Sequence, residues 1–460
     1  MDSTRHLPLH RISFKDHSLT CSYSSSPESH QKSAPQLGTG AVVYNSNGTS
    51  FTDTNLSPGQ SYTYTLYSEN NSYYSLGVTR TGVTSVTWNG TAWSNGDPNS
   101  TKSVVFAGPY TFTTDFYACS FTVNSPVSLT IPSGITLNIT NAVNVNTGGS
   151  LIFNNDSSLL QSNKNAVNSG DITYIRQTSV RRYDYTYWSS PLKLDYNFTL
   201  YKMSPYTLSD KYTSYNPNAS WVISYGGVLY MTPGEGYSVR GPQNTDIVTP
   251  TIQTASFIGV PNNGDVLKTT EPNRFNLLGN PYPSAINGIK LIGDTNIGTI
   301  YLWTHNTPPA NDGSDNKYKY ASSDYAAFNL SGGIKTGGDA VLPTGYIAAG
   351  QGFFAKPITT SITYTNDMRV GGNNGNFYKT AKTENLERNR VWLNFTNAQG
   401  AFKQILVGYI EGASNGLDLN YDAASFNGNT YIDFYSINET AKYSIQARAL
   451  PFENIDTIPL

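Results

Sequence analysis

Charged side chains are scarce in this chain of 460 residues, at 13% of the total, where globular proteins typically hold ~25%. The formal net charge is −2, so there is no basic field that would attract nucleic acid or an anionic lipid surface. No apolar run reaches the ~18 residues that a membrane-spanning helix requires. These deficits argue against a nucleic-acid-binding protein and against a membrane span.

Cysteine and histidine are also sparse. The two cysteines, Cys21 and Cys119, cannot make a disulfide framework and do not suggest a metal site. Four of the five histidines fall in the first 30 residues, which leaves His305 alone in the rest of the chain. No nucleophile motif accompanies it, and the sequence places no pair of facing carboxylates. We therefore expect a protein that is not an enzyme.

Asparagine, threonine, serine and glycine take the place of the missing charge, together with 34 tyrosines. Threonine, tyrosine, valine and isoleucine suit the pleated, half-buried surface of a sheet, and strong helix formers are few. This composition is typical of extracellular proteins and predicts an all-β fold with several domains.

One segment of the chain occurs twice. Residues 230–242 read YMTPGEGYSVRGP and residues 346–357 read YIAAGQGFFAKP, so each has a Gly-x-Gly-aromatic core between a tyrosine and a cation. An upstream element repeats in the same order, as YWSSPL and LLGNPYPSAI. The repetition indicates an internal duplication in which Tyr237 corresponds to Phe353. A dinucleotide-binding loop would need three glycines between a strand and a helix, whereas these glycines precede aromatic strands.

Two stretches form the predicted body of the protein. In residues 85–178, short apolar segments recur at a spacing of about eight residues between small polar turns, which fits a parallel β-solenoid or a meander. We favour the solenoid, with threonine and asparagine stacked in ladders at its turns. Residues 179–380 contain the duplication and are predicted to be a β-sandwich of two similar halves. The second half is longer, because residues 306–340 read as a long polar loop.

The remaining segments flank this body. Residues 1–36 show no alternation, which indicates a disordered tail or a wrongly started reading frame whose true N-terminus lies upstream. Residues 37–82 resemble the end of a fibronectin type III domain, because a Leu-x-Pro-Gly turn precedes a Tyr-x-Tyr strand. The charged run at 381–390 predicts a linker. Residues 391–460 hold four alternating strands and stop without a polar tail, as if cut there.

Several motifs together resemble one family of proteins. They are TWNGTAWSNGDP at 87–98, RRYDYTYWSSP at 181–191, FNLLGNPYPSAI, YIAAGQGFFAKP and the closing VWLNFT. Over roughly residues 37–460 they are similar to the C-terminal regions of large surface and secreted proteins of flavobacteria (Bacteroidetes). The resemblance implies a secreted or cell-surface, adhesin-like protein. It also implies export by the type IX secretion machinery, if the full-length protein carries the sorting domain that comes next in that family.

Two tryptophans are the candidate ligand-binding residues. Trp88 and Trp93 bracket an Asn-Gly turn of hairpin type in a chain with only six tryptophans. Flat rings on one ribbon can stack against a sugar, so the pair predicts a platform for glycans. The alternative is that both rings cap the end of the β-stack near Val104–Phe106.

Asp418, Asn420 and Asp422 are the candidate metal ligands, because Asp-Leu-Asn-Tyr-Asp has the D-x-N-x-D start of a calcium loop. Ala423 follows where an EF-hand has glycine, and Asn429 stands where it has its bidentate glutamate. Turns also use aspartate and asparagine for backbone reasons alone. Calcium is therefore the one cofactor considered, and the expectation is otherwise of no cofactor.

The functional expectation is a non-catalytic, structural and adhesive region of an exported bacterial cell-surface protein. Its partners would be glycans or other cell-surface polymers. The alternative is a carbohydrate-binding accessory region of a secreted hydrolase whose catalytic domain lies upstream.

Overall fold

The computed structural model describes residues 85–460, apart from 95, 306, 312–317, 321–323, 339, 377–388 and 427–431. Before residue 85 it describes only the backbone of two antiparallel strand pairs. These are β1 (Ser61–Leu66) with β4 (Val78–Val83) and β2 (Glu69–Asn70) with β3 (Tyr73–Tyr74). The predicted segment 1–36 lies outside the described residues, and so does most of the predicted linker.

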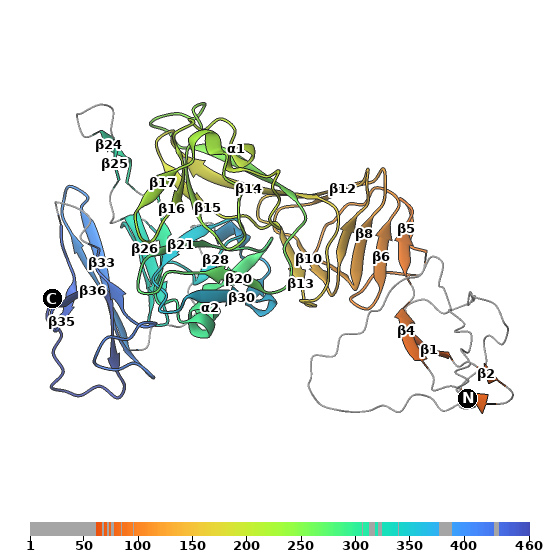
Figure 1. The fold of residues 1–460 in the computed structure, drawn as a ribbon. Coiled ribbons are helices and arrows are strands. Elements are labelled where there is room, and N and C mark those ends of the chain that lie inside the picture. The colour runs from red at the N-terminus through yellow and green to blue at the C-terminus, as the bar shows by residue number, and fades with distance from the viewer. Residues whose placement is uncertain are drawn as a thin grey trace, which may run out of the picture.

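The predicted all-β, multidomain fold is confirmed. A solenoid, a central pair of similar units and a C-terminal sheet follow one another along the molecule (Figure 1). The described part contains two α-helices, α1 (Leu200–Met203) and α2 (Gly288–Thr295). No described helix is long and apolar enough to cross a membrane.

The solenoid is built from three sheets of parallel strands. The first sheet contains β5 (Val86–Trp88), β6 (Ser103–Phe106), β8 (Ser120–Val123) and β11 (Val143–Val145). The second contains β7 (Phe116–Ala118), β10 (Thr136–Ile139) and β13 (Ser158–Gln161). The third contains β9 (Ser128–Ile131), β12 (Ser150–Phe153) and β14 (Ile172–Val180).

Each turn of the solenoid stacks like residues on like residues. Leu129 lies above Leu151 and Leu137 above Leu159, all buried, so the apolar segments form continuous columns. The predicted asparagine ladder is also present. Asn146 Nδ2 donates to Oδ1 of Asn124, 22 residues earlier, at 2.8 Å, and a second pair, Asn163 and Asn141, repeats the contact at 2.7 Å. The ladder satisfies side-chain amides that the tight turns would otherwise leave without partners.

Strand β14 belongs to both the solenoid and the central units. It pairs in parallel with β12 and antiparallel with β19 (Thr251–Gly259) along its whole length. The predicted boundary at residue 178 therefore falls inside one strand. The apolar residues of this strand lie mostly at its start, from Ile172 to Ile175, and four polar or charged residues follow before Val180. The sequence therefore gives no sign that the strand continues past residue 178.

The central units are two copies of one topology. Copy 1 has the ribbon β14–β19 and the sheet β15 (Tyr185–Trp188), β18 (Tyr237–Arg240), β16 (Tyr212–Tyr215), β17 (Trp221–Ile223). Copy 2 has the ribbon β20 (Val266–Thr269)–β30 (Ser361–Tyr364) and the sheet β21 (Asn276–Gly279), β29 (Gly352–Ala355), β23 (Ile300–Trp303), β26 (Tyr325–Asn329), β27 (Gly332–Ile334). Strand order is the same in both, with one added strand in copy 2.

The register of the two copies confirms the predicted duplication. Trp188 lies opposite Tyr237 in copy 1, and Leu278 lies opposite Phe353 in copy 2. Both turns that lead into these strands contain a glycine of positive φ, Gly234 at 77° and Gly350 at 75°. The Gly-x-Gly segments are thus turns into aromatic strands, for which the left-handed residue must be glycine.

The copies cross at a pseudo-two-fold axis and exchange backbone hydrogen bonds. Ser189 N donates to Gly350 O at 2.9 Å, and the equivalent Gly279 N donates to Gly234 O at 3.1 Å. Ser189 and Gly279 face each other at the crossing, where a Cβ added to Gly279 would overlap the Ser189 side chain. Only one of the two equivalent positions can therefore carry a side chain.

The predicted long loop 306–340 is wrong in part, because β26 and β27 lie within it. Ala326, Ala327 and Phe328 of β26 are buried in the core of copy 2. The polar residues around them concealed a short strand whose buried members are mostly small. The described remainder of this insertion includes a short hairpin, β24 (Ala310–Asn311) with β25 (Tyr318–Lys319).

The C-terminal module is a mixed sheet that covers copy 2. Its strands are β32 (Arg390–Thr396), β33 (Phe402–Ile410), β36 (Ala441–Ala449), β34 (Ala423–Ala424) and β35 (Ser436–Asn438). Leu406 and Ile445 pack against Tyr301 and Phe354 of copy 2. The alternation TYIDFYSI at 430–437 indicates the third of the four predicted strands. In its described part this prediction is wrong for 432–435, which are not strand, and β35 begins only at Ser436.

A smaller sheet, β28 (Tyr346–Ile347), β22 (Ala285–Asn287) and β31 (Arg369–Val370), joins copy 2 to the solenoid. The buried guanidinium of Arg369 donates to Leu159 O of the solenoid at 2.6 Å and lies over the ring of Tyr282. Asn374 Nδ2 donates to Ser157 O at 2.6 Å in the same junction. These bonds fix copy 2 against the last solenoid turn.

The crossing predicts a compensating pair of substitutions. Gly279→Ala should lower the free energy of unfolding by roughly 2–3 kcal/mol, because the methyl group overlaps Ser189 in a site that cannot expand. Adding Ser189→Gly should restore part of that loss, since it frees the equivalent position. Urea denaturation of the single and double variants measures both effects.

The matched control is Gly293→Ala in α2, where an added Cβ meets nothing within 4 Å. It should be neutral or stabilise by about 0.4–1 kcal/mol. Equal losses in the single and double variants would contradict the proposed packing at the pseudo-two-fold axis.

Candidate functional site

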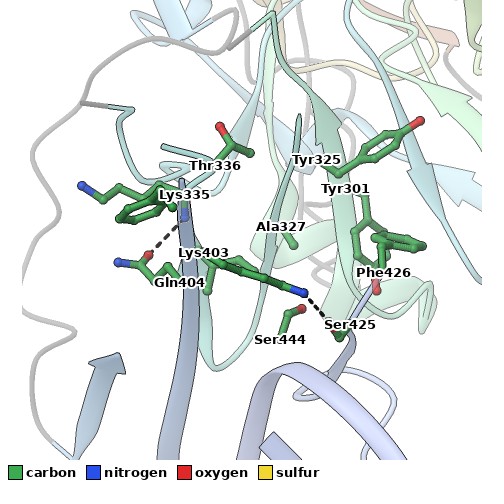
Figure 2. A pocket seen from close by; sticks show the side chains of 12 residues that line it. Tyr301, Tyr325, Ala327, Lys335, Thr336, Lys403, Gln404, Ser425, Phe426 and Ser444 are labelled. Atoms are coloured by element: carbon green, nitrogen blue, oxygen red, sulfur yellow. Dashed lines mark hydrogen bonds between the residues drawn. The ribbon is translucent and has the colours of Figure 1, made fainter. Parts of the chain in front are cut away.

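Two cavities stand out in the described part of the molecule, and their volumes show which of them could hold a small-molecule ligand. The one in Figure 2 lies between copy 2 and the C-terminal module and has a volume of about 40 Å³. Lys403 Nζ donates to Ser425 Oγ beside it, and Gln404 Oε1 accepts from Lys335 N. It has room for little more than water. The other has a volume of about 490 Å³, within the range of small-molecule sites.

The larger cavity, called the junction cleft below, lies where the solenoid, copy 1 and copy 2 meet. Strands from all three parts supply its walls, and Gln351 and Gly352 place it beside the crossing of the copies. Its lining also includes Asn155, Asp156, Gln177, Thr178, Ser179, Arg181, Asp184, Thr186, Tyr187, Ile252, Trp303, Thr304 and His305. No single part of the chain forms this cleft, so it exists only in the assembled fold.

Aromatic rings form one wall of the cleft. Tyr187 of β15 and Trp303 of β23 stack with ring centroids 6.0 Å apart at 25°. Tyr187 is buried, and its hydroxyl lies 2.6 Å from the hydroxyl of Tyr325, which fixes the ring. Trp303 is partly exposed, so its ring presents apolar surface to the cleft.

Neutral polar groups form another wall of the cleft, called the polar wall below. Gln177 and Thr178 come from β14, and Asn155 comes from the turn after β12, the strand that pairs with β14. Gln351 accepts from Ala348 N through Oε1 at 3.0 Å, and no described residue accepts from its Nε2. The cleft therefore offers amide and hydroxyl groups together with an apolar ring.

The charged residues at the cleft are paired within the protein. Asp184 Oδ2 accepts from both the backbone N and Nε of Arg181, at 2.8 and 2.9 Å. Arg181 Nη2 also donates to His305 O at 2.8 Å. Asp156 pairs with the buried guanidinium of Arg176 at 3.2 Å. With these charges matched in pairs, the cleft favours a neutral ligand over an ionic one.

His305, the single histidine beyond the N-terminal segment, lies at the cleft with both ring nitrogens directed at backbone. Nε2 lies 2.9 Å from Tyr185 O, and Nδ1 lies 3.2 Å from Ser179 O. Burial lowers the pKa of His305, and hydrogen bonding to the two carbonyl oxygens acts in the opposite direction. The ring thus ties β23 of copy 2 to the β14–β15 turn of copy 1.

Asp324 lies next to this network, because its backbone oxygen accepts from Thr304 N at 3.0 Å. Its carboxylate accepts from Thr307 N at 3.1 Å and from the Thr307 hydroxyl at 2.7 Å. Burial raises the pKa of Asp324 to about 6. Its carboxyl therefore binds a proton more tightly in the folded protein than in the unfolded chain.

Trp88 and Trp93 lie together at the first strand of the solenoid, whereas the junction cleft lies at its last turn. Their ring centroids are 5.0 Å apart and inclined at 53°, so the two rings do not form one flat surface. Trp88 Nε1 donates to Pro109 O at 2.8 Å, and Trp93 packs on Phe106. Both rings are half-buried against the solenoid core, and ligand binding by them stays a prediction.

The candidate calcium residues lie in the turn before β34. Asp422 is buried, and its two oxygens accept from Asp418 N and Ala447 N, each at 2.7 Å. Burial raises the pKa of Asp422 to about 6. Asn420 Nδ2 donates to Asn296 Oδ1 at 2.9 Å. The described residues contain no group of three or more acidic, histidine or cysteine side chains placed to hold a metal, and calcium here stays a prediction.

Comparison with known proteins places most of the chain in one family. Residues 79–460 match the model of a domain of unknown function (DUF8693). The chain belongs to this family. The matched range contains the solenoid, both copies and the C-terminal module, so the family is defined by these parts together. No curated protein and no solved structure matches the chain.

Sequence reasoning missed the junction cleft. Its aromatic wall joins Tyr187 and Trp303 from different copies, and its polar wall comes from a third part of the fold. The available signal was the duplication, since residues beside a pseudo-two-fold axis are brought together from both copies. Equivalent positions near the Gly-x-Gly turns, such as Gln351, were the ones to examine.

The solenoid cap yields a stability prediction. Trp93→Ala should lower the free energy of unfolding by roughly 2–4 kcal/mol, because it removes the ring that covers Phe106 and Phe116. If the cap is only structural, the folded Trp93→Ala variant should bind glycans as the unsubstituted chain does. Denaturant titration together with a glycan array separates the two roles, and loss of binding at unchanged stability would support a platform instead.

Asp324 yields a pH prediction. Because its folded pKa of about 6 exceeds the unfolded value of 3.8, its contribution to stability is complete below about pH 4 and falls as the pH rises through 6. In the unsubstituted protein, Asp324 should lower the free energy of unfolding by on the order of 2 kcal/mol as the pH rises from 4 to 7, and Asp324→Asn should remove this decrease. Urea titrations at several pH values measure the difference. A difference between the two proteins that does not change with pH would contradict the assignment.

Proposed function

We propose that this chain is a non-catalytic, adhesive region of an exported bacterial surface protein and that its junction cleft binds a neutral saccharide. The observation that carries the proposal is the cleft itself, whose lining combines an aromatic ring with uncharged amide and hydroxyl groups. A sugar has the matching chemistry, because its hydroxyls donate and accept hydrogen bonds while its ring carbons stack on aromatic faces.

The state of the titratable groups supports binding rather than catalysis. Asp184 accepts twice from Arg181, and both nitrogens of His305 are directed at backbone carbonyls. Neither group is positioned as a base toward the cleft, where a reacting atom would lie. Export through the type IX machinery belongs to the same proposal and rests on the motif resemblance alone.

The alternative within this proposal is an accessory binding region of a secreted hydrolase. The same cleft would then direct a catalytic domain to its polysaccharide. Binding of a soluble neutral oligosaccharide favours both versions equally. Retention on intact cells but not on insoluble polysaccharide would favour the adhesive version.

The direct test is a substitution that fills the cleft. A glycan array first identifies the neutral oligosaccharides that the unsubstituted chain binds. Thr178→Trp places an indole on the polar wall of the cleft and should weaken the binding of these oligosaccharides at least tenfold, as measured by calorimetry. Thr130→Trp is the matched control, because Thr130 is exposed two strands away in the same sheet and does not line the cleft. It should bind like the unsubstituted chain.

Three outcomes would overturn the proposal. They are an array on which no neutral glycan binds, binding of acidic glycans only, and equal binding by the two tryptophan variants. Melting temperatures of both variants show whether any loss of binding reflects unfolding.

A further inference from the structure

The edge strand of copy 1 is open where its equivalent in copy 2 is covered. In copy 2, β26 pairs with β23 on one side and with β27 on the other. In copy 1 the equivalent strand β17 pairs with β16, and no described strand pairs with its outer edge. The duplication therefore shows what kind of element fits there, namely an antiparallel strand.

The hydrogen-bond pattern shows which backbone groups face outward. Ser224 N donates to Tyr212 O, and Asn216 N donates to Ser220 O, so these pairs are of the hydrogen-bonded kind. Bonded and non-bonded pairs alternate along an antiparallel ladder. The N–H and C=O groups of Trp221 and Ile223 therefore point away from β16. Among the described residues, none is recorded as their partner.

The side chains around this edge are apolar and exposed. Trp221, Val222 and Ile223 are 41%, 45% and 43% exposed, and Tyr225 and Val228, which follow, are 68% and 67% exposed. No charged residue occurs from Tyr212 to Gly234. Proteins usually protect open edges with lysine, proline or a bulge, and this edge has none of them on β17.

We infer that β17 pairs antiparallel with β17 of a second copy of this chain. A two-fold axis through Val222 places Trp221 of each chain opposite Ile223 of the other chain. All four outward N–H groups, two from each chain, then have carbonyl partners. A symmetric contact brings each residue near its own equivalent, and the absence of charge removes the repulsion that would otherwise oppose it. This occupant fits better than an unrelated strand because the edge is complementary to itself.

The contact also predicts the strength of the dimer. Three residues on each side make a short ladder, and the exposed side chains beside it enlarge the contact only modestly, so the interface falls in the small class below ~1,200 Å². The dissociation constant should be on the order of 10 µM. Such a dimer would carry two junction clefts, and a polymeric ligand that engaged both would bind with a higher apparent affinity.

Sedimentation velocity over a concentration series tests the inference on the full chain. Ile223→Pro removes one outward N–H while leaving the bonds of Val222 to Ser214 in place, and the extended backbone of an edge strand tolerates proline. Ile223→Lys places two like charges near the two-fold axis. Both variants should weaken the dimer at least tenfold, and far-ultraviolet circular dichroism should show an unchanged fold.

Leu267→Lys is the matched control, since Leu267 is an exposed apolar residue on β20 of the other copy. It should leave the dimer unchanged. A chain that stays monomeric at roughly 500 µM, well above the expected dissociation constant, would overturn the inference. A dimer that resists Ile223→Lys, or that Leu267→Lys weakens equally, would overturn it as well.

Discussion

The reciprocal exchange of backbone hydrogen bonds at the pseudo-two-fold axis is the constraint on which the rest of the structure depends. Ser189 N and Gly279 N each donate to the turn glycine of the opposite copy. The Ser189 side chain fills the space at this crossing, which explains why the equivalent position on the other copy is Gly279. The bonds are buried, so breaking one would leave a donor and an acceptor without water. Each copy therefore needs the other in order to complete its own core.

The junction cleft follows from this crossing. Because the copies meet there, Tyr187 of one and Trp303 of the other form a single wall, and β14 of the solenoid contributes further lining residues. The scarcity of charge in the sequence also shapes the cleft. The charges at the cleft are paired in local ion bridges, Arg176 with Asp156 inside the solenoid and Arg181 with Asp184 in the turn before β15, which leaves uncharged groups to meet a ligand. A scaffold of this kind favours recognition of neutral polar surfaces.

Much of the fold was readable from the sequence, because it depends on local pattern. The apolar spacing predicted the solenoid, and the repeated Gly-x-Gly segments predicted the duplication and its register. Strand β26 was missed, because alanine at two buried positions gives a weak apolar signal. The boundary after the solenoid was misplaced because β14 serves two sheets at once. The cleft could not be predicted, since it depends on how three distant segments meet rather than on any one of them.

Residue-resolved amide hydrogen exchange tests the central claim most directly. If the crossing locks both copies into one cooperative unit, the amides of Ser189 and Gly279 should exchange only through global unfolding. Their protection should then give the same free energy as denaturant titration and should fall together in any destabilised variant. Exchange of one amide at a much lower free energy than the other would show that the copies open independently and would contradict the account.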